Sequence, residues 1–162
     1  MLAPALKRLA VHAAREEDLA AALALVKREK ERNRWIERTA DVLRSAVAEP
    51  EGEYRACVAE RDGELVALGA YGIVAGTIGT GMIYSILVAP RSRRAGIGER
   101  LLFQIKTDLA AAGARIVVAE IPGDPTVMRF RALLLTHGFR EEARIEDYYA
   151  DGIPQIISLC DL

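Results

Sequence analysis

With 162 residues, 51% of them hydrophobic, the chain has the size of one ordinary domain with its own core, which we place over residues 1–162. Its 22 lysines and arginines nearly balance its 23 aspartates and glutamates, which argues against nucleic acid or an anionic membrane as a partner. The two cysteines, Cys57 and Cys160, are too few for a disulfide framework. Neither they nor His12 and His137 have a metal-ligand spacing, so we expect no metal site.

The N-terminal segment gives an expectation about localisation. No apolar run approaches the ~20 residues that a membrane span needs. In residues 1–10, Lys7 and Arg8 follow a short apolar patch, which is the reverse of the order in a secretory signal. We therefore expect a cytoplasmic protein without a membrane partner.

The first part of the chain predicts one strand and two helices. Residues 8–13 alternate as a strand does, and the acidic residues 16–18 then favour a helix N-terminus. Leu19, Leu23 and Val26 recur at helical spacing after them. A second amphipathic helix is predicted over 33–48, before the break at 49–52.

Three strands should follow. Residues 54–60 and 65–74 flank Asp62-Gly63, a pair that supplies the positive φ angles of a type I′ hairpin turn. Residues 82–88 are nearly all apolar, which predicts a strand covered on both faces.

The second half alternates helices and strands. A basic loop over 91–98 leads into a helix that ends at Gly113, and 115–121 is a buried strand. Asp124 and Pro125 fit the N-cap and the first position of another helix, which ends at 137–138. Two strands over 139–148 and 153–160 close the chain. The order β-α-α-β-β-β-α-β-α-β-β implies a mixed sheet, with one parallel pair joined by a right-handed crossover.

The basic loop is suited to bind a pyrophosphate. Backbone N–H groups at a helix N-terminus are unpaired and carry partial positive charge. Glycines at 96 and 98 let the backbone approach a ligand closely, and Arg91, Arg93 and Arg94 add full charges.

Two nucleotide-binding motifs compete with this interpretation. A Walker loop needs Lys and then Ser or Thr at the helix start, where this chain has Glu99 and Arg100. A dinucleotide fingerprint needs a small residue in place of Leu101, although Glu120 matches its ribose-binding acid. The hairpin before the unit and the three arginines disfavour this second alternative.

The same stretch resembles the acetyl-CoA motif of the GNAT superfamily of N-acetyltransferases. That motif is Arg/Gln-x-x-Gly-x-Gly/Ala after a strand ending in Val-x-Pro, as in Val88-Ala89-Pro90 and Arg93 to Gly98 here. Gly138-Phe139 after the last helix and the order of the elements extend the resemblance over nearly the whole chain. It implies an α/β (α+β) fold with a mixed sheet of about seven strands. These are mostly antiparallel with one splayed parallel pair, and about four helices flank them.

The resemblance also implies how the coenzyme binds. Strand residues would pair with the pantetheine amides, and the loop amides would bind the pyrophosphate. The Val88 N–H would face the thioester carbonyl, where it could stabilise an oxyanion. An arginine of the last helix matches one in a GNAT-like subgroup. The implied coenzyme-binding residues are Ile86, Leu87, Val88, Arg93, Arg94, Ala95, Gly96, Ile97, Gly98, Glu99 and Arg131.

The catalytic residues depart from the family pattern. The tyrosine that often protonates coenzyme A falls at Leu134, and the asparagine that often contacts pantetheine falls at Val127. Replacement candidates are Glu120 as a base acting through water, and Tyr84, which stands where a strand glutamate is often found.

Tyr148 is a third candidate, beside Tyr149 in the last hairpin, where strand geometry lets only one of the two face the site. For the tyrosines the alternative role is that of packed core or hairpin aromatics, and for Glu120 that of a solvated strand end.

The implied activity is direct transfer of an acetyl group from acetyl-CoA to a primary amine of a small molecule or a protein N-terminus. The alternative is a non-catalytic acyl-CoA-binding domain, which the residues at 134 and 127 motivate. Residues 27–35 are rich in charge and include Trp35; they form either a solvated helix face or an acceptor lid for a carboxylate-bearing substrate. The resemblance is also compatible with a homodimer.

Overall fold

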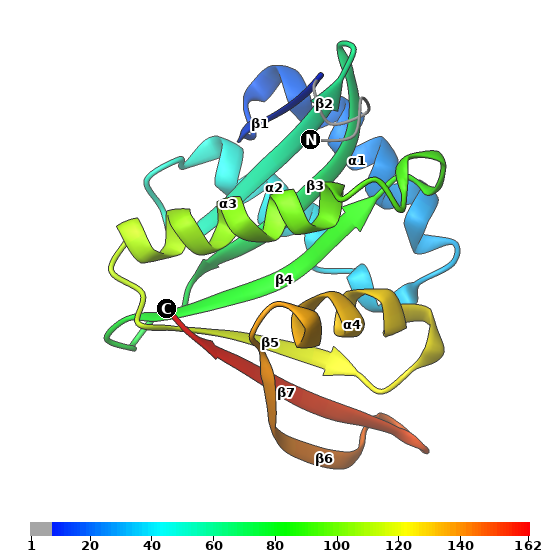
Figure 1. Cartoon of the computed structure of the whole chain (residues 1–162), viewed down its shortest axis with the longest axis vertical. Helices are drawn as coiled ribbons and strands as arrows, with labels where there is room; N and C mark the ends of the chain where they lie inside the picture. Colours follow the sequence, from blue (N-terminus) through cyan, green and yellow to red (C-terminus); the bar gives the residue numbers. More distant parts are fainter. Residues whose placement is uncertain (1–7) are drawn as a thin grey trace.

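A computed structural model describes residues 8–162, so most of the segment on which the targeting expectation rests lies outside the described residues. The chain folds around one mixed sheet with the strand order β1-β2-β3-β4-β5-β7-β6 (Figure 1). All neighbouring strands are antiparallel except β4 and β5, which are parallel. The predicted mixed sheet with one parallel pair is confirmed. Its strands in residues 8–162 are β1 (Leu9–Ala13), β2 (Tyr54–Arg61), β3 (Glu64–Ile73), β4 (Thr80–Val88), β5 (Ile116–Pro122), β6 (Arg140–Ala150) and β7 (Ile153–Asp161).

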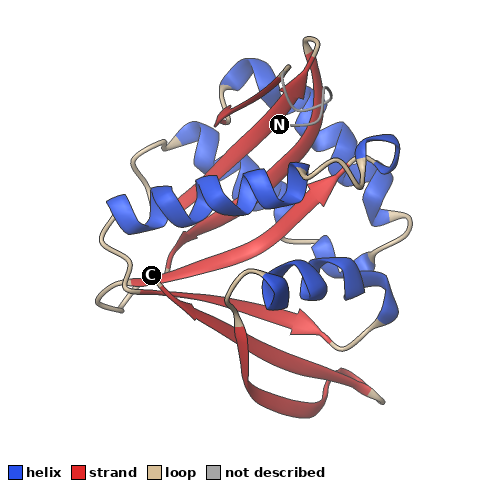
Figure 2. Cartoon of the chain, viewed as in Figure 1, coloured by secondary structure: helices blue, strands red, loops and turns tan. Residues whose placement is uncertain are grey.

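Helices cover both faces of the sheet. Figure 2 shows α3 and α4 on the near face, while α1 and α2 lie behind the strands. Among the described residues these are α1 (Glu16–Lys30), α2 (Thr39–Ala48), α3 (Ile97–Ala111) and α4 (Met128–Thr136), with the short 3-10 helices η2 (Arg34–Ile36), η3 (Pro90–Ser92) and η4 (Pro125–Val127).

The connection between α1 and α2 differs from the single helix predicted over 33–48. The Asn33 side chain accepts a hydrogen bond from the Trp35 backbone N–H at 3.0 Å, which caps η2, and α2 begins only at Thr39. Asparagine favours such caps because its side chain competes with the backbone for hydrogen bonds. The buried Thr39 hydroxyl is 2.8 Å from the Ser85 hydroxyl, so the start of α2 is tied to β4. Trp35 is therefore presented on a tight turn.

The turn before the last helix is also split. Asp124 accepts hydrogen bonds from the Thr126 backbone N–H and hydroxyl at 2.8 Å and 2.6 Å. Its predicted N-cap role is confirmed, but it caps the 3-10 helix η4 and α4 starts at Met128. The β2–β3 hairpin has the predicted turn, since Asp62 and Gly63 both have positive φ angles.

Strand β4 separates from its parallel neighbour halfway along its length. Pairing with β5 ends at Met82↔Val118, and the two strands then diverge, as Figure 1 shows. The register with β3 shifts between Ile83 and Ser85, which makes Tyr84 the extra residue of a β-bulge. After the bulge the strand changes faces: Ile83 packs under α3, whereas Leu87 packs under α1 and α2.

The predicted cover on both faces of β4 is wrong, because its residues alternate between buried and half-exposed. The half-exposed side chains of Tyr84, Ile86 and Val88 all line a cleft. This part of the strand is open because β5 has moved away from it.

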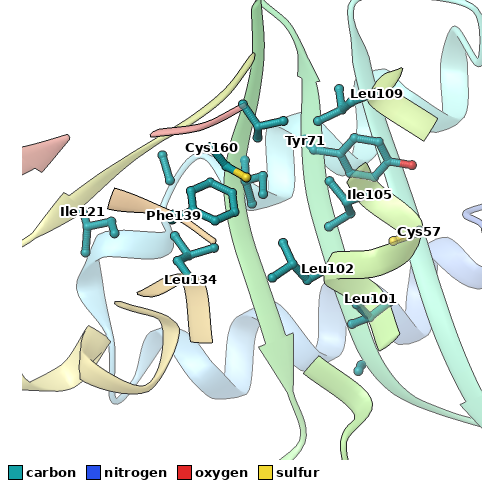
Figure 3. Close-up of a cluster of buried hydrophobic side chains, with 14 of the residues drawn as sticks. Cys57, Tyr71, Leu101, Leu102, Ile105, Leu109, Ile121, Leu134, Phe139 and Cys160 are labelled. Carbon is teal, nitrogen blue, oxygen red and sulfur yellow. The ribbon is translucent and has the colours of Figure 1, made fainter. Parts of the chain in front are cut away.

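The core under α3 and α4 supports the start of α3. The apolar stripe predicted for this helix is buried against the sheet, as Figure 3 shows for Leu101, Leu102, Ile105 and Leu109. The Tyr71 hydroxyl donates a hydrogen bond to Asp108 at 2.6 Å on the same helix. Burial and the charge of Asp108 raise the pKa of the nearby Cys57 thiol to about 12.

Candidate functional site: a cleft between the diverging strands

A cleft of about 670 Å³ opens where β4 leaves β5. Its walls come from the second half of β4, the loop before α3, the end of β5, the start of α4 and the connection between α1 and α2. Segments that are far apart in the sequence thus meet where the sheet opens between β4 and β5. Such a gap between parallel strands is a common place for a ligand in α/β folds.

One end of the cleft is lined by backbone N–H groups. Gly96 is the N-cap of α3 with φ 75°, and Arg94 also has a left-handed φ of 61°. In the described residues, the amides of Arg94, Ala95 and Gly96 donate no hydrogen bond to another backbone group, and the first intrahelical bond is Arg100 N–H to the Gly96 carbonyl at 3.1 Å. Unpaired amides at the N-terminus of a helix favour an anion, and the helix dipole adds to the attraction.

The three arginines of this loop have different partners. Arg91 forms an ion pair with Glu64. Arg93 lies 2.8 Å from the carboxylate of Glu29, which is only 6% exposed, and also donates to the Val88 carbonyl at 3.2 Å. Within residues 8–162, the exposed Arg94 forms no ion pair. The expectation that all three charges are available to a ligand is therefore corrected: Arg94 is free, while Arg93 braces the loop against α1.

Gly98 keeps the cleft open beside the loop. Its φ is not in the left-handed region, so the backbone conformation does not demand glycine here. A Cβ at this position would lie 3.4 Å from the Leu133 side chain and 3.9 Å from that of Val88. A longer side chain would fill the space between α4 and β4, so the absence of a side chain leaves room for a ligand.

Most of the residues assigned to the coenzyme by resemblance lie together in this cleft. Two do not line it: Ala95 and Arg131. Arg131 forms an ion pair with Glu141 of β6, so its guanidinium group already has a protein partner outside the cleft. The residues that do line the cleft are Ile86, Leu87, Val88, Arg93, Arg94, Gly96, Ile97, Gly98 and Glu99.

The other end of the cleft contains a carboxylate and a tyrosine. Glu120 on β5 and Tyr84 on β4 both line the cleft. Burial raises the pKa of Tyr84, and the neighbouring Tyr54 and the charge of Glu120 raise it further. Burial likewise raises the pKa of Tyr149, to which Glu120 again contributes. Both phenols thus hold their protons firmly, and Glu120 lies close enough to each to influence it electrostatically.

Aromatic side chains gather at this end, where they form two groups. The rings of Trp35 and Tyr149 are 5.2 Å apart and meet edge to face, and those of Tyr148 and Tyr149 are 4.9 Å apart. On the other side, the rings of Tyr54 and Tyr84 are 5.8 Å apart. The only tryptophan and four of the five tyrosines of the chain therefore lie around the acidic end of the cleft.

The two hairpin tyrosines have different positions. Neither tyrosine lines the cleft, but Tyr148 is 55% exposed, whereas Tyr149 is half-buried and contacts the cleft residue Trp35. The structure thus brings Tyr149, not the predicted Tyr148, toward the site. Strand alternation could not distinguish them because Asp147 is left-handed (φ 55°) and the β6–β7 register shifts between Ile145 and Ala150.

The positions where the family often has its tyrosine and asparagine are apolar packing sites here. Leu134 is 0% exposed and packs among the core residues under α4 (Figure 3). Val127 is also buried at the edge of the cleft. Neither side chain can exchange a proton, so any proton transfer in this cleft requires other side chains that line it.

One cluster outside the cleft was missed by the analysis of ligand spacing. His12 of β1, Asp18 of α1 and Glu60 of β2 place ligand atoms within 4.8 Å of one another. These groups have protein partners: Asp18 accepts the Arg15 backbone N–H at 2.9 Å, and His12 Nδ1 is 2.8 Å from the Ala13 carbonyl oxygen.

Among the described residues, no helix combines the length and apolar character needed to cross a membrane.

Comparisons with known proteins agree with this geometry. Residues 20–130, more than half of the chain, match the model of the acetyltransferase (GNAT) family. A structure from Desulfovibrio desulfuricans assigned to the GNAT family superposes with a TM-score of 0.81 at 26% identity, covering 94% of this chain and 98% of that one. No curated protein matches the chain significantly in sequence.

Two further solved structures share the fold at lower identity. A Salmonella typhimurium protein assigned as an acetyltransferase, solved with its cofactor acetyl-CoA, has a TM-score of 0.80 at 19% identity, covering 96% of this chain and 94% of that one. The Escherichia coli ribosomal-protein-S18-alanine N-acetyltransferase has a TM-score of 0.71 at 21% identity, with coverages of 94% and 93%.

Proposed function

Because the chain belongs to the acetyltransferase (GNAT) family, we propose that its cleft binds acetyl-CoA and that the enzyme transfers the acetyl group directly to a primary amine. The observation that carries this proposal is the arrangement of the cleft. Unpaired amides of a helix N-terminus lie at one end, and the carboxylate of Glu120 and the protonated Tyr84 lie at the other. A diphosphate at the first end would direct a thioester toward the second.

The residues of the cleft fit the coenzyme by their chemistry. The amides from Arg94 to Gly98 supply donors for a diphosphate, and the free Arg94 side chain adds charge. The exposed edge of β4 from Ile86 to Val88 can pair with the amides of an extended pantetheine arm as a further strand would. The side-chain-free position at Gly98 leaves space for the chain of the ligand.

The acidic end supplies the groups that amide formation requires. The bound thioester provides an activated acetyl group. An amine attacks only when it is neutral, and Glu120 can take its proton directly or through a water molecule. The Tyr84 hydroxyl, which keeps its proton because of burial, can donate a proton to the departing thiolate. An ammonium loses two protons on becoming an amide: one leaves through Glu120 to solvent before attack, and the second, released from nitrogen after attack, replaces the proton that Tyr84 delivers to sulfur.

A covalent acetyl-enzyme is not part of this proposal. Cys57 and Cys160 are both buried, and the raised pKa of Cys57 keeps it as an unreactive thiol at neutral pH. Neither cysteine lines the cleft. Direct transfer from thioester to amine needs only that the two reactants be held close and correctly oriented.

The acceptor belongs to one of two classes, a small amine or a protein N-terminus. The Escherichia coli structural neighbour is named for a protein N-terminal alanine, but at 21% identity it indicates the fold only. The cleft of this chain must therefore be judged from its own side chains.

The proposed function is tested by two measurements on the purified protein. Isothermal titration with CoA should show binding, and thiol release from acetyl-CoA should depend on added amine across a panel of small amines and peptides with free N-termini. Binding without amine-dependent release would favour a non-catalytic acyl-CoA-binding domain. Absence of binding at millimolar CoA would contradict the assignment of the cleft itself.

A further inference from the structure

We infer that the acceptor end of the cleft selects amines that carry a carboxylate beside the amine, as a free amino acid does, in preference to the N-terminal residue of a protein, whose carboxyl group is part of a neutral peptide bond. This inference rests on the proposed function and names its substrate class. It comes from two arginines, Arg34 and Arg38, that the mechanism above does not use.

Neither arginine lines the cleft itself, but each lies against an aromatic residue that does. The guanidinium carbon of Arg34 is 4.4 Å from the centre of the Trp35 ring, and that of Arg38 is 5.1 Å from the centre of the Tyr84 ring. Trp35 and Tyr84 both line the cleft. Stacking holds a guanidinium group by its face and leaves its N–H groups free at the edge, where they can bind a carboxylate in the plane of the group.

Both guanidinium groups lack a carboxylate partner. Within residues 8–162, neither Arg34 nor Arg38 forms an ion pair or donates a side-chain hydrogen bond to the protein. Hydrogen bonds from Thr126 and, to a smaller extent, the charge of Arg34 lower the pKa of Asp124. Eight other arginines of the described residues form ion pairs with acids, namely Arg8, Arg15, Arg44, Arg91, Arg93, Arg131, Arg140 and Arg144.

The resulting charge pattern matches a zwitterion. Glu120 lines the cleft together with Tyr84 and attracts a cationic amine before that amine loses its proton. The two stacked arginines lie against the cleft residues Trp35 and Tyr84 and attract an anion. An α-amino acid places an ammonium and a carboxylate one carbon apart, so both sets of charges can be satisfied by one small molecule.

The aromatic surfaces indicate the rest of the acceptor. Trp35 with Tyr149 and Tyr84 with Tyr54 present ring surfaces around the same end of the cleft. Such surfaces bind an apolar side chain more favourably than a polar one. A protein N-terminus would offer a neutral peptide group where the free amino acid has its carboxylate. It would therefore leave both arginines without an anionic partner.

The test compares matched acceptors that differ in this one charge. Thiol release from acetyl-CoA is measured with L-phenylalanine against L-phenylalaninamide, and with L-leucine against L-leucinamide. The carboxylate raises the pKa of the adjacent amine, so intrinsic reactivity at neutral pH favours the amides. We expect kcat/KM to be at least about tenfold higher for the acids in spite of this, since charge-assisted contacts are strong in a partly enclosed site.

Arg34→Gln and Arg38→Gln assign that preference to the named groups. Each should raise KM for the acids about tenfold and leave the kinetics of the amides unchanged. Arg44→Gln is the matched control, because it removes the same charge from α2, where Arg44 pairs with the exposed Asp41 away from the cleft; its kinetics should equal those of the wild type.

The outcomes separate the inference from the proposed function. Amides acetylated as well as or better than the acids, or a preference that survives both arginine variants, would overturn the inference while the acetyltransferase assignment stands. CoA binding without release by any acceptor would overturn both.

Discussion

The two ends of the cleft are built by different means. The coenzyme end comes from one continuous stretch, the end of β4 and the loop into α3, and it offers mainly backbone N–H groups. The acceptor end is assembled from the η2 turn, the bulge of β4, the end of β5 and the β6–β7 hairpin, and it offers side chains. One half is thus defined by a short motif, while the other exists only in the folded chain.

This difference has a consequence for specificity. Backbone donors persist when surface side chains change, so the coenzyme end can retain its ligand through extensive substitution. The acceptor end can alter its preference through single residues such as Arg38 or Tyr149 without disturbing the sheet. Substitutions at the two ends should therefore affect different measurable quantities.

The largest effect is expected at Gly98. Gly98→Glu would place a charged side chain between Leu133 and Val88 and next to the diphosphate position, and should lower CoA affinity more than about 100-fold. Isothermal titration measures the loss. Gly98→Ala is the control for the fold, since its Cβ would make ordinary contacts, and both variants should unfold near the wild-type temperature. Undiminished CoA affinity in the Glu variant would place the coenzyme elsewhere.

At the acceptor end, Glu120→Gln should reduce kcat by about 100-fold and leave CoA affinity unchanged, because a general base contributes roughly that factor. The shape of the pH–rate profile should change at the same time. Steady-state kinetics as a function of pH provides the check. A variant whose profile keeps the wild-type shape would show that another group takes the proton.

A smaller effect distinguishes the tyrosines. Tyr84→Phe should lower kcat about tenfold by removing a proton donor, while Tyr148→Phe, outside the cleft, should behave as wild type. Because burial raises the pKa of Tyr84 above its ordinary 10.0, the wild-type rate should not fall from ionisation of this phenol below pH 10. If the rates of the two variants were interchanged, our assignment of Tyr84 would be wrong.

Substitutions of the two loop arginines should affect different quantities: that of Arg94 the affinity for CoA, and that of Arg93 the stability of the fold. Arg94→Asn keeps a residue that tolerates the left-handed backbone, and should weaken CoA binding about fivefold with no change in unfolding. Arg93→Gln should instead lower the free energy of unfolding by about 2 kcal/mol, since it leaves the buried Glu29 without its partner. Denaturant unfolding and titration of both variants test this division. If both variants lost the same CoA affinity and had the same free energy of unfolding, this assignment of roles would be wrong.

The smallest effect at neutral pH concerns the core beneath the coenzyme loop. The folded pKa of Cys57 is raised from 9.0 to about 12, so the folded state holds a proton that the unfolded chain loses above pH 9. This stabilisation is complete below pH 9 and should decline by about 1.4 kcal/mol per pH unit between pH 9 and 12.

Denaturant unfolding of wild type and Cys57→Ala across this range checks the sign. The alanine variant should show a shallower decline, although Tyr71, whose pKa burial also raises, adds its own loss above pH 10 in both proteins. Parallel declines in the two proteins would mean that Cys57 does not contribute.

Much of the fold followed from local patterns. Alternation, helical periodicity and the Asp62-Gly63 turn placed the strands and helices of the sheet, and the errors lay at element starts. The helix expected from 33 begins at Thr39 because the Asn33 side chain caps a separate turn, and periodicity carries no signal for that competition. The β4 face that the sequence suggested was covered is half-exposed because its neighbour diverges.

The sequence by itself determined the family motif, the parallel crossover and the anion-binding loop, because each depends on residues within one short segment. Only the tertiary structure decided which groups are free. It paired Arg93 with Glu29 across 64 positions, turned Tyr149 rather than Tyr148 toward Trp35, and left Arg34 and Arg38 on aromatic walls without partners. Such contacts join distant segments through the packing of the whole sheet, and no local spacing encodes the distance between them.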